Sequence, residues 1–109
     1  MILDYSEMKW EDFPNFKGGE KSMKAQMFFD GTNRILHAIL VPGASIGLHK
    51  HETNSEIIYF IKGEGTAILD GKTTKMKPGM VQYCEKGHEH TLINEGTEDL
   101  EFFAVVPEQ

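Results

Sequence analysis

Short runs of strand-forming residues, recurring about every ten residues, constrain the fold of this chain more than any other feature. We expect nine strands, over residues 24–29, 34–41, 46–50, 56–61, 65–70, 72–76, 80–84, 89–94 and 100–106. No stretch shows the sustained 3.6-residue apolar period that is typical of a long amphipathic helix. The pattern therefore predicts an all-β fold, which could be a sandwich, a jelly roll or a barrel.

Turn-forming residues separate these runs and support the same division. Pro42-Gly43 and Pro78-Gly79 lie between expected strands, and Asp70-Gly71 lies between two runs that are close enough to form a hairpin. Both central residues of a type I′ hairpin turn need a positive φ, which Asp and Gly tolerate. Asp70-Gly71 is therefore the strongest hairpin signal in the chain.

The first 20 residues stand apart from the strand pattern. Trp10, Phe13 and Phe16 lie among acidic residues, and Gly18-Gly19 then interrupts the segment. A spacing of three residues fits one side of a short helix, but it equally fits an extended arm that packs on the barrel or on a partner subunit. We expect residues 1–109 to form a single domain, with residues 1–20 as this N-terminal arm or short helix.

Charge and composition exclude several classes of partner. Asp and Glu number 17 against 11 Lys and Arg, so the net charge is −6, which repels phosphate backbones and anionic lipids. We therefore expect no nucleic-acid or membrane partner. The longest apolar stretch, residues 35–41, is too short to span a bilayer and contains His37. The N-terminus lacks the basic region of a signal peptide, and the single cysteine, Cys84, fits a reducing compartment, so we expect a cytoplasmic protein.

Four of the five histidines form two His-x-His pairs, one at positions 49 and 51 and the other at positions 88 and 90. Alternate residues of a strand point to the same face, so His49 and His51 are expected to project together. Glu56 follows the turn-prone segment Thr53-Asn54-Ser55, which lets the next strand present a carboxylate at the same place. If the strand of His90 is a neighbour, three imidazoles and one carboxylate converge.

Three nitrogen ligands and one oxygen ligand suit a divalent transition metal ion, such as Mn²⁺, Fe²⁺, Co²⁺, Ni²⁺, Cu²⁺ or Zn²⁺. An octahedral ion would keep two positions open for water or a substrate, whereas a tetrahedral ion would be closed until its coordination expanded. Imidazoles must be neutral to bind a metal, so we expect the affinity to fall below the ordinary histidine pKa of about 6.5.

Both groups of histidines lie in stretches that resemble the two motifs of the cupin family. The first motif is Gly, five residues, His-x-His, three or four residues, Glu, six residues and Gly, matched here by Gly43, His49, His51, Glu56 and Gly63 with four residues before the Glu. The second motif is matched by Gly79, Gly87, His90 and Asn94, with Glu85 where the family usually has proline. The two motifs cover residues 43–94, about half of the chain.

The resemblance implies a double-stranded β-helix, which is a jelly-roll-like cupin barrel. It also implies that His49, His51, Glu56 and His90 hold one divalent transition metal ion inside the barrel. Cupins of this size often form homodimers, so a second copy of the chain is an implied partner. A metal with open positions in a concave barrel further implies a small-molecule ligand.

Several other residues are candidates for the site. His88 could be a general acid or base or a further ligand, but it could also lie in solvent at the rim of the barrel. Tyr83 and Gln82 must face opposite ways, and we expect Tyr83 to line the interior as a catalytic group. If Glu56 faces inward, Ile58 and Phe60 also do, as a pocket wall or as plain core. Cys84 could approach the pocket or act as a small buried apolar residue.

These features leave the function open between three classes. A metal-dependent enzyme acting on a sugar or organic acid, as an isomerase, lyase or dioxygenase, is favoured by the ionisable groups around His88, Glu89 and His90. A non-catalytic module that binds or senses a small ligand needs the same metal and pocket but no acid or base. A purely structural metal, clamping the barrel, is the third possibility.

Overall fold

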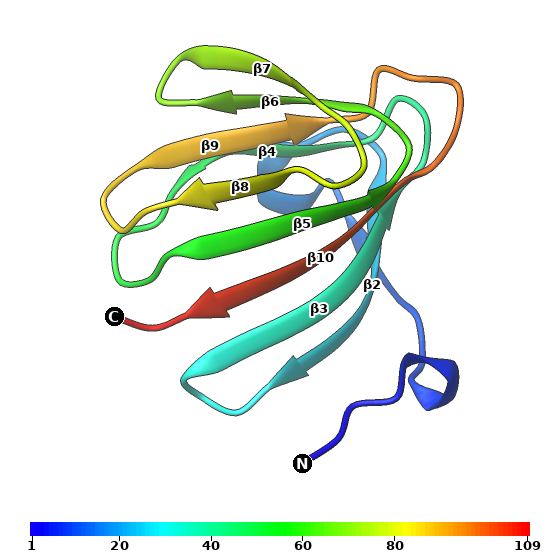
Figure 1. Ribbon diagram of the computed structural model, residues 1–109, viewed down its shortest axis with the longest axis vertical. Coiled ribbons are helices and arrows are strands. Elements are labelled where there is room, and N and C mark those ends of the chain that lie inside the picture. The colour runs from blue at the N-terminus through cyan, green and yellow to red at the C-terminus, as the bar shows by residue number, and fades with distance from the viewer.

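Two antiparallel sheets face each other in the computed structural model, which describes residues 1–109 (Figure 1). The larger sheet has the strand order β1-β2-β3-β10-β5-β8, and the smaller sheet has the order β4-β9-β6-β7. The strands are β1 (Glu11–Pro14), β2 (Ser22–Phe29), β3 (Asn33–Leu40), β4 (Ser45–Lys50), β5 (Glu56–Lys62), β6 (Gly65–Leu69), β7 (Lys72–Met76), β8 (Val81–Cys84), β9 (Glu89–Ile93) and β10 (Leu100–Pro107). Two 3₁₀ helices, η1 (Tyr5–Glu7) and η2 (Phe16–Gly18), lie in the N-terminal segment.

The prediction of an all-β fold is confirmed, and each of the nine expected strands is present with its ends within two residues of the expected positions. The turn between β6 and β7 is the predicted hairpin, in which Asp70 and Gly71 both have positive φ, at 49° and 80°. Neither 3₁₀ helix, at three residues each, has the length or apolar character of a membrane-spanning helix.

The N-terminal segment is mostly extended, and it contains one strand that the sequence pattern did not predict. β1 pairs with β2, with Phe13 opposite Met23. The rings of Phe13 and Phe16 contact each other edge to face, 5.7 Å apart, and both pack against the core. The segment thus covers the edge of the larger sheet with two aromatic side chains.

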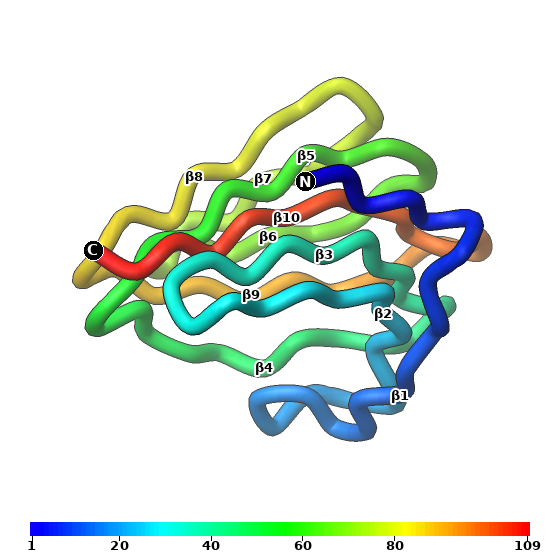
Figure 2. The backbone as a smooth tube through the Cα atoms, turned by 90° about the horizontal axis from the view of Figure 1, so that it is seen from below, coloured from blue at the N-terminus to red at the C-terminus, as the bar shows by residue number.

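The same segment continues along the edge of the smaller sheet, beside β4 (Figure 2). A Cβ atom added at Gly47 of β4 would lie 2.0 Å from the backbone oxygen of Lys17 in η2. A Cβ atom added at Gly19 would lie 2.0 Å from the oxygen of Ser45. Two glycines therefore allow backbone to approach backbone, and η2 closes the opening between the sheets.

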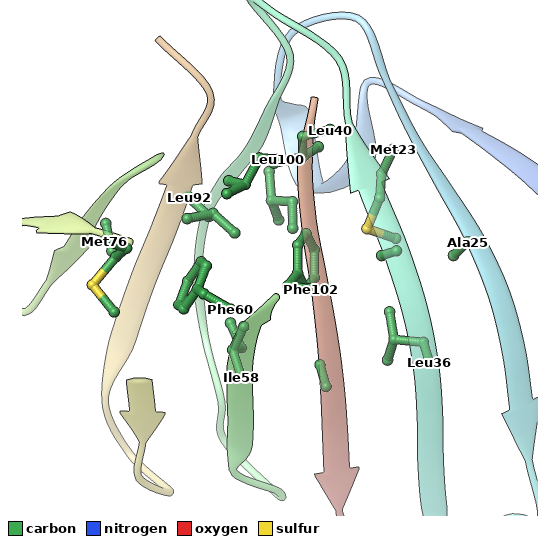
Figure 3. Packing of buried hydrophobic residues seen from close by; sticks show 14 of the residues in the cluster. Met23, Ala25, Leu36, Leu40, Ile58, Phe60, Met76, Leu92, Leu100 and Phe102 are labelled. Atoms are coloured by element: carbon green, nitrogen blue, oxygen red, sulfur yellow. The ribbon is translucent and has the colours of Figure 1, made fainter. Parts of the chain in front are cut away.

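Apolar side chains from the inner faces of both sheets fill the space between them (Figure 3). Ile58 and Phe60 of β5 lie beside Phe102 of β10, and the Phe60 and Phe102 rings are 6.2 Å apart. All three are at most 1% exposed, so each contributes about 1.5–3 kcal/mol relative to exposure in water. Some of these core side chains also line the cavity at the candidate site.

The outer face of the larger sheet carries several exposed apolar side chains. Ile57, Tyr59 and Ile61 of β5 and Val81 and Tyr83 of β8 are each more than 40% exposed. They are neighbours on one face, since Ile57 pairs with Tyr83 and Tyr59 pairs with Val81.

Candidate metal centre

The structure brings together the four side chains that the sequence singled out. One ligand atom from each of His49, His51, Glu56 and His90 can be chosen so that all four lie within 4.8 Å of one another. Glu56 Oε1 is 3.2 Å from His51 Nε2 and 3.0 Å from His90 Nε2, and His90 Nε2 is 3.2 Å from His49 Nε2. The side chains of three of the four residues are buried, and that of His49 is half-buried.

An irregularity in β4 aims His49 into the barrel. Ile46 faces inward and pairs with Leu92, and strict alternation would turn His49, three residues later, outward. The pairing with β9 shifts between Ile46 and His49, so that His49 lies opposite His90 instead. This bulge re-aims the end of β4 towards the interior.

The other three residues of the cluster come from neighbouring strand ends. His51 lies just beyond β4, where its backbone N–H donates to the His88 oxygen at 3.0 Å. Glu56 begins β5 after the intervening turn, as expected, and His90 is the second residue of β9. The two sheets thus contribute opposite sides of one cluster.

Each imidazole is oriented by an oxygen atom on its far side. His49 Nδ1 is 2.7 Å from the Gly47 oxygen, His51 Nδ1 is 2.6 Å from Asn54 Oδ1, and His90 Nδ1 is 2.9 Å from Gln82 Oε1. These oxygens only accept hydrogen bonds, so each Nδ1 carries the proton and donates it.

In the neutral form of each ring, the Nε2 lone pair therefore faces the centre of the cluster. A set of three imidazole lone pairs and one carboxylate oxygen fits a divalent transition metal ion. Acceptors behind the rings are the usual means by which proteins orient histidine ligands to a metal.

In the metal-free cluster, the pKa values of Glu56, His51 and His49 are shifted by burial and by neighbouring groups. Burial alone would raise the pKa of Glu56, but hydrogen bonds from His51 and His90 outweigh it and lower that pKa to about 2. Burial opposes a charge on His51, but its hydrogen bonds to Glu56 and Asn54 raise its pKa. Burial lowers the pKa of His49. Glu56 is thus ionised at neutral pH, and His51 takes a proton more readily than His49.

A cavity of about 460 Å³ adjoins the cluster. His49, His51 and Glu56 lie in its wall. Its apolar lining comes from the N-terminal segment, both sheets and the end of β10, and consists of Phe13, Phe16, Met23, Met27, Leu36, Ile46, Phe102 and Val106. Its charged lining, apart from Glu56, consists of Lys17, Arg34, Lys50 and Glu52. The cluster therefore faces a space of the size that small-molecule ligands occupy.

The prediction that Tyr83 lines the interior is wrong. β8 pairs with β5 so that Cys84 lies opposite Glu56 and Gln82 lies opposite Ile58. Residues directly opposite each other in a sheet share a face, so Gln82 and Cys84 point inward. Gln82 is 7% exposed and Tyr83 is 49% exposed. Gln82, which the sequence offered only as the alternative, orients His90.

His88 also lies outside the cluster. It precedes β9, its side chain is 46% exposed, and its Nδ1 contacts Asp70 in the β6–β7 turn. The hydrogen bond from His88 to Asp70 raises the pKa of the imidazole. The expectation that His88 serves the site as an acid, base or ligand is therefore not supported, and its position matches the rim alternative.

Ile58, Phe60 and Cys84 point inward, and their positions match the packed-core alternative rather than the pocket wall. They belong to the packed interior, and none of the three lines the cavity. Burial raises the pKa of the Cys84 thiol to about 12, which makes it a small apolar core residue.

Three features of the site escaped the sequence analysis. Asn54 and Gln82 orient histidines from outside both His-x-His pairs, and Phe13 and Phe16 close the cavity from the N-terminal segment. Asn54 was visible only as a turn residue. Its Nδ2 lies 3.4 Å from Glu108 Oε1, which turns Oδ1 towards His51.

His37, by contrast, lies away from the cavity, and both of its ring nitrogens have hydrogen-bond partners. Its Nδ1 is 2.8 Å from Gln26 Oε1 and its Nε2 is 2.5 Å from Glu101 Oε2.

Comparison with known proteins agrees with this geometry. The model of the cupin domain family matches residues 36–106. The "Oxalate-binding protein" of Thermotoga maritima is 34% identical over 112 residues, which cover 97% of this chain and 93% of that protein.

Solved structures give the same result. A crystal structure from Thermotoga maritima, described as that of a predicted oxalate decarboxylase, superposes with a TM-score of 0.93 at 34% identity, over 100% of both chains. KdgF from a Halomonas species shares the fold, with a TM-score of 0.81 at 16% identity, over 100% of this chain and 94% of that one. The chain belongs to the cupin family.

Proposed function

We propose that this protein binds one divalent transition metal ion at His49, His51, Glu56 and His90 and uses it to hold a small carboxylate anion in the adjoining cavity. The observation that carries the proposal is the orientation of the three imidazoles. Each Nδ1–H is committed to an oxygen acceptor, so the neutral rings direct three Nε2 lone pairs to the same place as one carboxylate. A bound ion would supply a positive centre with open positions for a carboxylate oxygen.

The charges around the cavity support an anion as the ligand. Beyond the cluster itself, its lining holds three cationic side chains, Lys17, Arg34 and Lys50, and one anionic side chain, Glu52. This excess of positive charge stands out in a chain whose net charge is −6. The printed name of the Thermotoga maritima relative, an oxalate-binding protein, supports the same class of ligand.

The positions of the candidate acids and bases favour binding over catalysis. The two residues that the sequence offered as catalytic groups, His88 and Tyr83, are exposed and do not line the cavity. Of the ionisable groups that favoured an enzyme, His88 and Glu89 are exposed, and His90 belongs to the cluster itself. The residues left to act on a ligand are cationic groups that hold and orient it.

Metal content and ligand binding test the proposal together. The protein is stripped with a chelator, reloaded separately with Mn²⁺, Co²⁺, Ni²⁺ and Zn²⁺, and assayed for bound metal. Calorimetry then measures binding of oxalate and of uncharged glucose. We expect one ion per chain, oxalate binding only to the loaded protein, and no binding of glucose.

Two histidine variants provide a matched pair. His90→Gln should lose the metal and the oxalate binding, whereas His88→Gln, two residues away, should keep both. Retention of metal by His90→Gln, or oxalate binding without metal, would refute the proposal. Release of formate or carbon dioxide from oxalate would instead make the protein an enzyme.

A further inference from the structure

Arg34, the only arginine of the chain, lies in the wall of the cavity. It is near the start of β3 and shares the inward face of that strand with Leu36. In the larger sheet it pairs with Phe29 of β2 on one side and with Val106 of β10 on the other. Arg34 is thus half-buried on an apolar inner face, where an unpaired charge costs free energy.

No acidic side chain neutralises Arg34. Its Nη1 lies 3.0 Å from Met27 Sδ, a weak acceptor, and its Cζ lies 4.2 Å from the centroid of the Phe29 ring. All four ion pairs of the protein involve histidines, although the chain has 17 acidic residues. A guanidinium has five N–H donors, and most of those of Arg34 have no protein partner.

The cluster and Arg34 are separated by hydrocarbon. β10 lies between β3, which carries Arg34, and β5, which carries Glu56, so the two backbones are about 10 Å apart. The cavity wall around Arg34 contains Met27, Leu36 and Val106, whose side chains offer a ligand no acceptor stronger than the Met27 thioether sulfur. One space therefore has a metal-binding group at one place, a free guanidinium at another and an apolar wall beside them.

We propose that Arg34 is a specificity-determining residue that binds the distal carboxylate of a dicarboxylate ligand whose two acid groups are joined by a short hydrocarbon spacer. This inference rests on the proposed function, in which the metal centre holds the proximal carboxylate. A guanidinium binds a carboxylate through two parallel hydrogen bonds, which gives it both strength and orientation. Oxalate, whose carboxylates share a single bond, is too short to use both anchors and the apolar wall at once.

A series of acids measures the contribution of the second anchor. The metal-loaded protein is titrated calorimetrically with oxalate, succinate, glutarate and adipate, and with butyrate as a one-carboxylate counterpart. We expect at least one of the three longer diacids to bind more tightly than oxalate and about 10- to 100-fold more tightly than butyrate, the gain from charge-assisted hydrogen bonds in a half-buried site.

Arg34→Gln should remove that gain for the longer diacids and leave butyrate binding within about twofold. Arg34→Lys should restore it only in part, because an ammonium does not form the paired hydrogen bonds. Lys72→Gln is the control, because it also removes one positive charge but does so at an exposed position on β7. It should leave the affinity for every acid unchanged. Metal content shows that each variant keeps its fold and its metal centre.

The outcomes separate this inference from the proposed function. If oxalate binds most tightly and Arg34→Gln leaves every diacid unchanged, Arg34 is no anchor and only this inference fails. The same holds if the variant weakens butyrate and the diacids equally, since that is a general effect of charge. If no carboxylate binds the metal-loaded protein at all, the proposed function fails and this inference falls with it.

Discussion

Replacement of Gln82 by methionine should weaken metal binding without touching a ligand. Gln82 Oε1 accepts the hydrogen bond from His90 Nδ1 at 2.9 Å, in a position where Gln82 is 7% exposed. Without that acceptor the ring can move its proton to Nε2, the atom that the metal needs. A buried hydrogen bond of this kind is worth about 1–3 kcal/mol, so the preference for the binding tautomer falls by about 5- to 150-fold.

The chain offers a matched control for this variant. Gln26 Oε1 accepts a hydrogen bond from His37 Nδ1 at 2.8 Å, and Gln26 is 3% exposed, but this pair lies away from the metal centre. Gln26 Nε2 also donates to the oxygens of Tyr5 and Met8, at 2.7 and 2.8 Å. Gln26→Met should therefore cost more stability than Gln82→Met and leave the metal affinity unchanged.

Competition with a zinc-responsive dye measures the affinity, and thermal unfolding in a chelator measures the stability of the metal-free chain. We expect Gln82→Met to bind Zn²⁺ about 10- to 100-fold more weakly, which is the usual effect of losing such a partner. The reasoning is refuted if Gln82→Met stays within about twofold of the original affinity, or if Gln26→Met weakens binding as much.

Three more predictions follow from the geometry. Because the pKa of His51 is raised above 6.5 in the metal-free protein, Zn²⁺ must displace its proton. The affinity for Zn²⁺ should therefore rise as the pH increases through that raised pKa and be weaker at lower pH. A Zn²⁺ affinity that is constant between about pH 5.5 and 8.5 would contradict the assignment. Gly47→Ala would place a Cβ atom 2.0 Å from the Lys17 backbone oxygen, so it should destabilise the protein by about 1–3 kcal/mol in denaturant titrations and expose the N-terminal segment to protease. The apolar outer face of β5 and β8 is expected to pair two copies of the chain; light scattering should then show a homodimer that Tyr59→Lys converts to a monomer, and a monomeric original protein would exclude this.

Local sequence patterns were sufficient to predict the strands and the four residues of the cluster. Glycine and proline mark the turns, and β-branched and aromatic residues mark the runs between them, so nine strands could be placed without knowing how they pair. The spacing of His49 and His51 and the turn before Glu56 were likewise local features. Each of these predictions depended on only a few consecutive residues.

Pairing between distant strands decided what the sequence could not. Whether Gln82 or Tyr83 faces inward depends on the register of β8 against β5, and that register is set by residues some 25 positions apart. His49 faces inward through a bulge that alternation alone would not predict. The position of Arg34 in the cavity wall became visible only when β3, β10 and the N-terminal segment were placed around one space.

The four residues of the His49, His51, Glu56 and His90 cluster occupy interior volume that hydrocarbon could fill. Glu56 and His90 are 8% and 2% exposed, and without an ion their polar atoms face one another at 3.0 Å. Replacing buried ionic groups by apolar side chains of similar volume often stabilises a protein. Thermal stability and metal binding are therefore opposed at these positions. Laboratory selection for heat resistance in the presence of a chelator would raise thermal stability and reduce metal binding.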